Sequence, residues 1–314
     1  MPLPIAFHKS IKSLARRLGY VVFHKSELNT HEGCLLIRYK QNEYTPFGKK
    51  RLDNPKGIEL LKKLLPVGYV LKPKQDIIVQ KEGYHYVPDI YGKSANKLSD
   101  IREEETFFEL ANAVYEQQTS CLYFDRLHVL YQAAVNVIRN APPERRLNFI
   151  EVGVYKGGGT YFLASVAERM AKGRVQLFAV DTFSGHDKLD LPNGEEGKHN
   201  EQRFTDTTFE SVQAYLKEFP NVAVLQGRIQ DRAEQLADQS FDLVHLDVDI
   251  YLPTLFSLRF FGERLNPGGI IIVDDYNYRT CPGIKQAIDD YLSETPFNFY
   301  KVELLSGQCL LISR

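Results

Sequence analysis

From about residue 147 to its C-terminus, the chain alternates short apolar runs with longer segments whose apolar residues recur on one helical face. Apolar runs of about four to eight residues are typical of buried strands, and the longer segments are typical of amphipathic helices. The pattern predicts strands at 147–152, 174–180, 221–226, 241–247 and 269–274. It predicts helices at 159–171, 207–219, 230–238, 252–265 and 282–293. This alternation indicates a parallel sheet covered by helices.

Two further apolar runs, at 297–305 and 308–314, end the chain. Ser306 and Gly307 separate them, which indicates a β-hairpin. Five parallel strands followed by an antiparallel hairpin match the strand count of a class I methyltransferase, since a plain dinucleotide-binding fold more often continues with another parallel strand. We therefore predict a Rossmann-like, doubly wound α/β domain with a seven-stranded sheet and an antiparallel C-terminal hairpin.

The chain ahead of residue 147 divides into two parts. Segments 103–118 and 122–140 carry apolar residues on a recurring helical face, and we expect them to form helical cap segments over the active-site mouth. Residues 1–100 mix short β-like runs with many turn residues, which predicts a smaller α+β region of unknown fold. An amphipathic helix at its start is indicated by Ile5, Ile11, Leu14 and Leu18. The predicted domains are therefore 1–100 and 101–314.

Composition is that of a globular protein. With 314 residues and 43% hydrophobic content, the chain can bury one large core, or one large and one small core. No apolar run approaches the roughly 18 residues of a membrane span, and the N-terminus lacks the features of a secretory signal, so we expect a cytoplasmic protein without a transmembrane segment. The cysteines are widely scattered and include no CxxC pair, so neither a zinc site nor a disulfide framework is expected.

The net charge of −1 conceals an asymmetry between the two parts of the chain. Residues 1–100 contain 18 Lys and Arg against 9 Asp and Glu, which leaves 21 against 31 for residues 101–314. The two parts can pack on each other through these charges, or the basic region can attract a phosphorylated or membrane-bound substrate. A nucleic-acid partner is not expected, because no basic run has interleaved aromatic residues.

Two apolar runs end in acidic residues. DLVHLDVDIY contains Asp247 and Asp249, and GGIIIVDDYNY contains Asp274 and Asp275. Acids that follow buried parallel strands lie at the carboxyl edge of the sheet, where α/β enzymes bind their ligands. Four crowded carboxylates would repel one another unless a hard divalent cation with oxygen ligands bound among them. These four residues, called the acidic cluster below, are the first candidates for chemistry.

A glycine-rich turn, EVGVYKGGGT at 151–160, joins the first strand of the sheet to its helix. Glycine lets the backbone pass close beneath a cofactor. The spacing of Gly153 and Gly157 differs from the dinucleotide pattern GxGxxG, and the turn lacks the lysine of a P-loop. Asp181 ends the second strand, where a carboxylate can accept both hydroxyls of an adenosine ribose. The combination favours S-adenosylmethionine over NAD; the alternative is a tight strand-to-helix connection without a cofactor.

Together these motifs resemble the class I methyltransferases related to macrocin O-methyltransferase. The resemblance covers about residues 105–314, and it is carried by FDRLHVLYQA, FIEVGVYKGGGT, VDTFSG, HLDVDIYLPT and NPGGIIIVDDY. The family methylates sugar hydroxyls with S-adenosylmethionine and Mg²⁺, so the resemblance implies an O-methyltransferase that acts on a sugar or glycoside. Residues 1–100 are not explained by it.

The resemblance implies roles for residues at the sheet edge. Asp247, Asp274 and Asp275 are expected to bind Mg²⁺. Asp249 is expected to act as the general base, or only to position a ligand or a substrate hydroxyl. The residues expected to contact the cofactor are Glu151, Gly153, Gly157, Asp181, Thr182, Phe183, Gln226, Gly227 and Asp247.

Two neighbouring features add to this site. His245 shares the strand face of Asp247, and we interpret it as a satisfied core histidine, not as a base. The polar segment at 184–205 is long for an ordinary connection, and such loops are often lids or recognition elements. His186, Asp187 and His199 within it are expected either to contact substrate or to remain solvated.

Other functions remain open from the sequence. A catechol or another small aromatic diol would use the same metal chemistry as a sugar diol. A catalytically silent cofactor-binding or scaffolding protein is a further alternative, although such a protein would not need the complete acidic cluster. A homo-oligomer is possible, and the acceptor is expected to be a small molecule.

Overall fold

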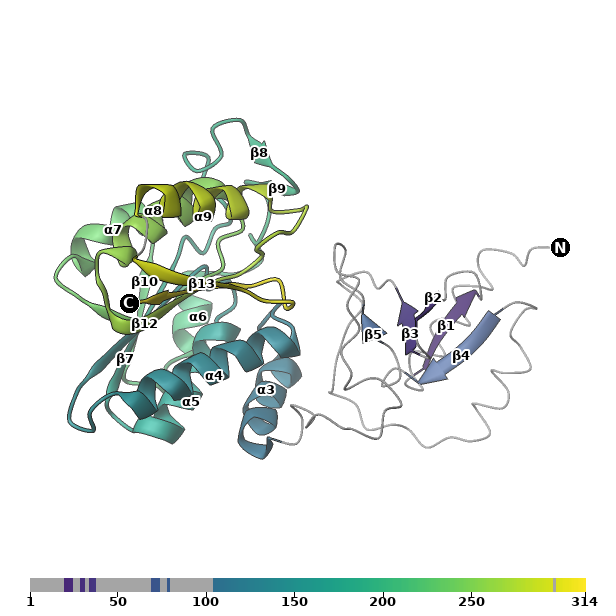
Figure 1. Cartoon of the computed structure of the whole chain (residues 1–314), viewed down its shortest axis with the longest axis horizontal. Coiled ribbons are helices and arrows are strands. Elements are labelled where there is room, and N and C mark those ends of the chain that lie inside the picture. Colours follow the sequence, from purple (N-terminus) through teal and green to yellow (C-terminus); the bar gives the residue numbers. More distant parts are fainter. Residues whose placement is uncertain are drawn as a thin grey trace. The chain divides into compact units, whose positions relative to one another are not determined.

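The computed structural model describes residues 20–24, 29–31, 34–37, 69–73, 78–79, 104–295 and 298–314. The chain divides into two compact units, Met1–Glu104 and Glu105–Arg314 (Figure 1). The helix expected around Ile5 to Leu18 lies outside the described residues. Whether the basic residues of the N-terminal region pack on the acidic part of the chain or attract a substrate therefore stays a prediction.

Short paired strands make up the described part of the first unit. β1 (Tyr20–His24) pairs antiparallel with β4 (Tyr69–Pro73). β2 (Asn29–His31) pairs antiparallel with β3 (Cys34–Ile37), and β3 pairs parallel with β5 (Ile78–Val79). These strands lie where the sequence has its short β-like runs.

The second unit is built on one seven-stranded sheet with the order β10-β7-β6-β11-β12-β14-β13. Its parallel strands are β6 (Leu147–Val152), β7 (Val175–Asp181), β10 (Val222–Gln226), β11 (Phe241–Leu246) and β12 (Leu265–Val273). β13 (Phe299–Glu303) and β14 (Cys309–Ser313) form the antiparallel hairpin, in which β14 pairs with β12. The predicted class I methyltransferase fold is confirmed.

Helices cover both faces of this sheet (Figure 1). One layer contains α3 (Glu105–Gln117), α4 (Phe124–Asn140) and α5 (Gly158–Ala171). The other contains α7 (Ile229–Leu236), α8 (Tyr251–Gly262) and α9 (Pro282–Glu294). The segments predicted as a cap are α3 and α4. They pack against α5, and α4 also contacts β11 and β12, so both helices belong to the layer that covers the sheet.

Two element boundaries differ from the prediction for physical reasons. α6 (Phe209–Tyr215) begins with a capping box between Thr208 and Ser211, and it ends several residues before the predicted end at 219. Pro220 disfavours the helical conformation for Phe219, so a helix could not include the predicted last residue. β11 ends at Leu246, so the first acid after it lies in the turn and not in the strand.

The strand order reverses between β6 and β11. From β6 the chain adds β7 and β10 on one side, and it then crosses back to add β11 and β12 on the other side. Every residue of β11 is buried, as expected for a strand that helices cover on both faces. Ligands of open α/β sheets bind beyond the carboxyl ends of strands at such a reversal of strand order. In the described part of the chain, no helix has the length and apolar character needed to cross a bilayer.

Gly153 is held between two strand ends and generates the first prediction. Its φ is +93°, and a Cβ added there would lie 1.9 Å from the backbone oxygen of Asp247. Gly173 is the matched control, because its φ is +72° but nothing lies within 4 Å of its added Cβ. We expect Gly173→Ala to lower the free energy of unfolding by about 1 kcal/mol, from backbone strain alone.

Gly153→Ala should cost at least about 3 kcal/mol, because two backbone segments must move apart. Urea unfolding of both variants and of the unchanged chain measures the difference. Equal losses in the two variants would contradict the tight packing of β6 against the turn after β11.

Candidate active site

The acidic cluster is assembled by the register of neighbouring strands. β11 and β12 pair in parallel with Leu246 opposite Val273, so the acids that follow both strands meet at one edge. The backbone N–H of Asp274 donates to the carbonyl of Leu246 at 2.8 Å, and that of Asp247 donates to the carbonyl of Val152 at 2.9 Å. The structure thus brings together the four acids that the sequence singled out.

Left-handed backbone turns direct two of these acids. Asp249 has a φ of +65° and Asp275 a φ of +56°, in a region that residues other than glycine rarely adopt. Such conformations persist only where the surrounding structure enforces them, and they are common at functional sites. In both turns the chain reverses directly after a strand and leaves a carboxylate at the sheet edge.

Arg126 from α4 is the main cation at the cluster, and its side chain is 4% exposed. Its guanidinium donates to Asp274 Oδ2 at 3.0 Å and to Asp275 Oδ1 at 2.7 Å. It also donates to the carbonyl of Ser306 at 3.3 Å. The sequence analysis assigned Arg126 no role. The available signal was its position on the apolar face of an amphipathic helix, where a charge needs a buried partner.

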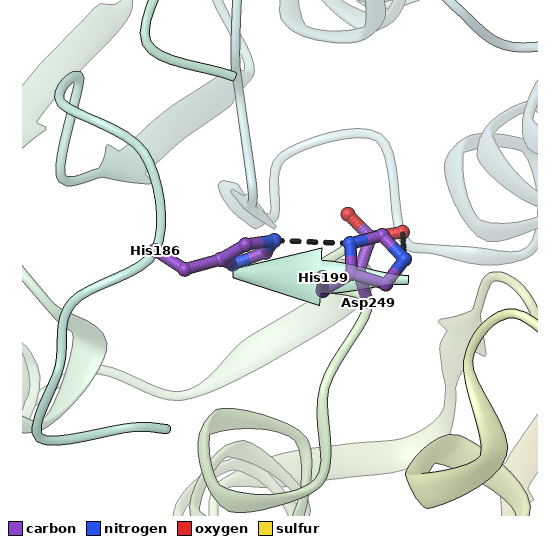
Figure 2. A group of neighbouring side chains, drawn as sticks. All are labelled: His186, His199 and Asp249. Atoms are coloured by element: carbon purple, nitrogen blue, oxygen red, sulfur yellow. Dashed lines mark hydrogen bonds and ion pairs between the residues drawn. The ribbon is translucent and has the colours of Figure 1, made fainter. Parts of the chain in front are cut away.

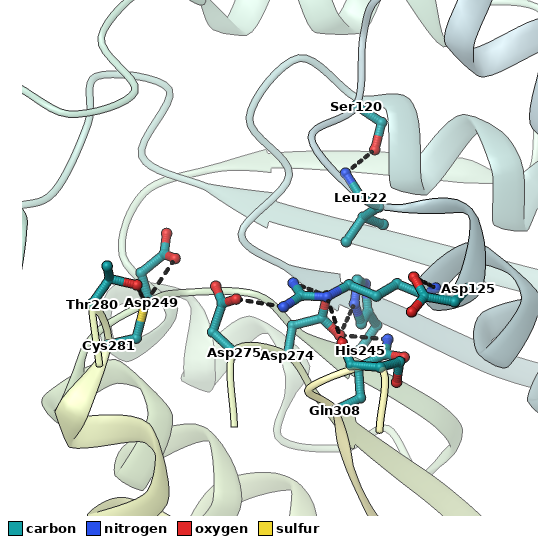
Figure 3. Close-up of polar contacts among 12 residues, drawn as sticks. Ser120, Leu122, Asp125, His245, Asp249, Asp274, Asp275, Thr280, Cys281 and Gln308 are labelled. Carbon is teal, nitrogen blue, oxygen red and sulfur yellow. Dashed lines mark hydrogen bonds and ion pairs between the residues drawn. The ribbon is translucent and has the colours of Figure 1, made fainter. Parts of the chain in front are cut away.

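His245 is the second cation, and Figure 3 shows it beside Asp274. It is fully buried, with Nδ1 2.9 Å from Glu151 Oε1 and Nε2 3.4 Å from Asp274 Oδ1. Burial lowers its pKa, but the carboxylates of Asp274 and Glu151 outweigh that effect and raise the pKa to about 10. His245 is therefore a buried core histidine that carries a positive charge at neutral pH, with a hydrogen bond from Nδ1 to Glu151 and an ion pair, without a hydrogen bond, between Nε2 and Asp274.

These partners hold Asp274 in its ionised form. Burial raises its pKa, whereas Arg126, His245 and Gln308 lower it, and the net value falls to about 2. Gln308, the residue before β14, donates from its side-chain amide to Asp274 Oδ1 at 2.6 Å, so the C-terminal hairpin also supports the site (Figure 3). Asp274 is thus the best-fixed carboxylate of the cluster.

Asp247 and Asp249 are the less compensated members of the acidic cluster. Burial raises the pKa of both well above the usual range, and neighbouring carboxylates add to the rise: Asp274 and Asp275 for Asp247, and Asp275 and Asp247 for Asp249. If the four acids of the cluster and Glu151, which also pairs with His245, were all ionised, Arg126 and His245 would leave three negative charges unbalanced. A divalent cation with oxygen ligands fits this donor set and this charge.

The predicted metal ligands fall into two neighbouring groups of ligand atoms, each within 4.8 Å. Asp247 and Asp274 gather with His245, whereas Asp275 gathers with Asp249 and Cys281. Each carboxylate has about four lone-pair positions, so Asp274 and Asp275 can bind Arg126 and still offer oxygen to a cation. The donors present at this edge therefore fit a hard divalent ion.

The glycine turn lies at the same edge of the sheet as the acidic cluster, where Gly153 meets the backbone of Asp247. Asp181 Oδ2 accepts from the backbone N–H groups of Val154 and Tyr155, both at 2.8 Å, and Oδ1 accepts from that of Phe183 at 2.7 Å. The carboxylate expected to bind a ribose thus also fixes the turn. Gly153 has no Cβ, so its backbone can pack directly against the backbone of Asp247, and this contact brings the glycine turn beside the acidic cluster.

Gln226, Gly227 and Glu151, which were also predicted to contact the cofactor, lie around the same edge. The side chain of Glu151 differs from the others because it is bound within the protein. Gln226 is opposite Asp181 in the sheet, and the N–H of Gly227 donates to the carbonyl of Asp181 at 2.8 Å. Glu151 is buried, and both its oxygens are engaged within the protein, one by His245 and one by the Thr160 hydroxyl. In this structure the contacts of Glu151 therefore hold other parts of the protein in place.

The polar segment at 184–205 contains a small hairpin of β8 (Glu195–Glu196) and β9 (His199–Asn200). Glu196 accepts from the backbone N–H of Tyr251 at 3.0 Å, at the start of α8. Asp190 accepts two hydrogen bonds from the guanidinium of Arg228, at 2.9 and 3.0 Å. These contacts hold the segment against the elements that surround the acidic cluster.

His186 and His199 of this segment lie side by side, with 3.1 Å between Nε2 of the first and Nδ1 of the second (Figure 2). His199 also lies 3.8 Å from Asp249 Oδ1. Burial is the main cause that lowers the pKa of both histidines to about 4, so both rings are neutral at physiological pH. They are not solvated loop residues, because they point inward toward an acid of the cluster.

Comparisons with known proteins give one family and several relatives. A model of the macrocin O-methyltransferase (TylF) family matches residues 58–298. Mycinamicin III 3″-O-methyltransferase of Micromonospora griseorubida is 25% identical over 213 residues, which are 63% of this chain and 82% of that protein. A tetracenomycin-C 4′-O-methyltransferase of Streptomyces olivaceus, whose name specifies a rhamnosyl group, is 25% identical over 46% of this chain. The match spans only 57% of that relative's length.

Solved structures agree on the fold. The O-methyltransferase NovP superposes with a TM-score of 0.57 at 20% identity, over 67% of this chain and 97% of that one. The calicheamicin methyltransferase CalS11 gives a TM-score of 0.50 at 18% identity, over 68% of this chain and 94% of that one.

The buried position of Arg126 leads to a second prediction. Arg126→Met should lower the free energy of unfolding by about 3–5 kcal/mol, because Asp274 and Asp275 lose their shared cation inside the protein. Arg169→Met is the control, since Arg169 pairs with Glu109 at 3.0 Å on the exposed surface and its loss should leave stability nearly unchanged. Denaturant unfolding in the presence of chelator measures both. Equal effects of the two substitutions would refute the central place of Arg126.

Proposed function

Since the chain belongs to the macrocin O-methyltransferase family, we propose that it transfers a methyl group from S-adenosylmethionine to a hydroxyl of a sugar or glycoside, with Mg²⁺ at the acidic cluster. The observation that carries this proposal is the meeting of a glycine turn and four carboxylates at the reversal point of one sheet. Small-molecule sites in such sheets lie at this point.

The glycine turn supports the cofactor half of the proposal. Gly153 packs against the backbone of Asp247 and so brings the turn beside the acidic cluster. Asp181 fixes the turn and lies at the end of β7, where a ribose would lie. When bound, S-adenosylmethionine supplies a methyl group on a positively charged sulfur. The protein then has to hold the acceptor oxygen in line with that methyl group, which is an effect of position and orientation.

The acidic cluster supports the other half. Asp247, Asp274 and Asp275 would hold Mg²⁺, whose chemistry when bound is to lower the pKa of a coordinated hydroxyl. Asp249 would accept the proton of that hydroxyl. Burial and neighbouring acids raise the pKa of Asp249, whereas a bound Mg²⁺ would lower it, so its role as proton acceptor rests on its place beside the proposed metal ligands. Arg126 and His245 would keep Asp274 and Asp275 fixed while the proton moves.

The acceptor class is inferred from the names of the relatives. One relative is named for a rhamnosyl derivative of tetracenomycin and another for the 3″ position of mycinamicin III. The half-buried carboxylates of Asp247 and Asp249 and the neighbouring polar segment at 184–205 suit a hydroxyl-rich molecule better than an apolar one. We therefore propose a glycosylated small molecule as the acceptor.

Asp249→Asn provides the test of this function. With rhamnosyl glycosides as acceptors and Mg²⁺ present, we expect kcat to fall by about 10²–10⁴-fold, because the hydroxyl loses its proton acceptor. The affinity for S-adenosylhomocysteine, measured by calorimetry, should stay the same. Asp238→Asn removes an exposed acid outside the cluster and should leave both quantities unchanged.

Full turnover in Asp249→Asn would rule out its role as the base. A wild-type chain that binds S-adenosylhomocysteine but methylates none of the glycosides would contradict the proposed acceptor class and leave the cofactor assignment intact.

A further inference from the structure

Next to the acidic cluster, three different ligand types converge from three separate segments. His199 comes from β9, Asp249 from the turn after β11, and Cys281 from the residue before α9. Figure 2 shows His199 and Asp249 facing each other, and Figure 3 shows Cys281 directed at the same carboxylate. We propose that these three side chains form a second metal site, which binds a borderline divalent transition metal such as Zn²⁺.

The distances between the ligand atoms suit such an ion. His199 Nε2 lies 3.3 Å from Cys281 Sγ and 3.8 Å from Asp249 Oδ1, and the last two atoms are 3.7 Å apart. Bonds of about 2.0 Å to nitrogen and oxygen and about 2.3 Å to sulfur, at tetrahedral angles, separate ligand atoms by roughly 3.3–3.6 Å. The three atoms therefore need to shift by only a few tenths of an ångström to surround one ion.

A second histidine orients the first. A histidine that binds metal through one ring nitrogen usually donates a hydrogen bond from the other, which fixes its tautomer and ring orientation. His199 Nδ1 lies 3.1 Å from His186 Nε2, so a proton on Nδ1 leaves the lone pair of Nε2 directed at Cys281 and Asp249. Phe204 stacks on the His199 ring at 6.1 Å, which limits its rotation.

The donor set separates this site from the one proposed for Mg²⁺. A thiolate and an imidazole favour zinc, cobalt and similar ions, whereas sites made only of carboxylate oxygens favour magnesium. Asp275 lies within the same 4.8 Å group as Asp249 and Cys281, so it is available as a fourth ligand where the two sites meet. Metal binding would displace the thiol proton of Cys281.

The widely scattered cysteines gave no hint of this site in the sequence. Zinc sites are recognised in a sequence by ligands that lie close together along the chain. These ligands lie at positions 199, 249 and 281 and meet only in the folded protein. One consequence rests on the proposed function: an ion held here would occupy Asp249 and should inhibit methyl transfer.

Cobalt binding tests the site directly. We would strip the full-length chain of metal, keep its thiols reduced with a reductant that does not bind metal, and titrate it with Co²⁺. We expect one equivalent to produce a sulfur-to-cobalt charge-transfer band that Zn²⁺ abolishes and excess Mg²⁺ does not. The band should disappear in Cys281→Ser and in His199→Asn. His186→Asn should bind Co²⁺ roughly 10–100-fold more weakly.

Cys309→Ser is the matched control, because Cys309 is also a buried free thiol but lies in β14. It should keep the band, as should Asp274→Asn. Absence of the band in the unchanged chain would overturn the proposal, and so would its retention in a Cys281→Ser chain with native circular dichroism. Absence of inhibition by Zn²⁺ while the band is present would count against Asp249 as the base, and not against the metal site.

Discussion

The buried contact of one guanidinium with two adjacent carboxylates is the interaction on which the site depends. Arg126 reaches from α4 to Asp274 and Asp275 at the end of β12, so it joins the helical layer to the sheet as well as balancing charge. Removing a buried charge from its partner costs far more than removing a surface pair. With His245 on the other side of Asp274, the arginine allows four acids to occupy one edge of the sheet.

Arg126 and His245 do not neutralise all the negative charge at this edge, and the charge that remains can bind a cation. Two cations against the four acids of the cluster and Glu151 leave Asp247 and Asp249 in surroundings that resist their ionisation. A hard divalent cation would relieve that resistance and polarise a hydroxyl in the same step. The fold thus creates a position where a cation binds and where a proton acceptor lies beside it. The glycine turn, which we propose as the cofactor site, lies along the same edge.

Much of this arrangement was predictable from the sequence because it depends on local patterns. The apolar runs fixed the strands, and their acidic ends fixed the cluster, since parallel strands bring their carboxyl ends to one edge. Arg126 was not predictable in the same way, because its partners lie almost 150 positions later in the chain. The charge of His245 depends on Glu151 and Asp274, which approach it from different segments. Cys281 and His199 are likewise far apart in the sequence, so their contact could not be predicted from local patterns.

The central claim is that the acidic cluster requires one hard divalent cation, and a Mn²⁺ titration of the metal-free chain tests it most directly. Measured by electron paramagnetic resonance with S-adenosylhomocysteine present, the chain should bind one Mn²⁺ that Mg²⁺ displaces. Cys281→Ser should bind it equally well, and Asp274→Asn should bind it at least roughly tenfold more weakly, because a neutral amide replaces a charged ligand. The absence of a site that Mg²⁺ can compete for, or unchanged binding in Asp274→Asn, would contradict the account.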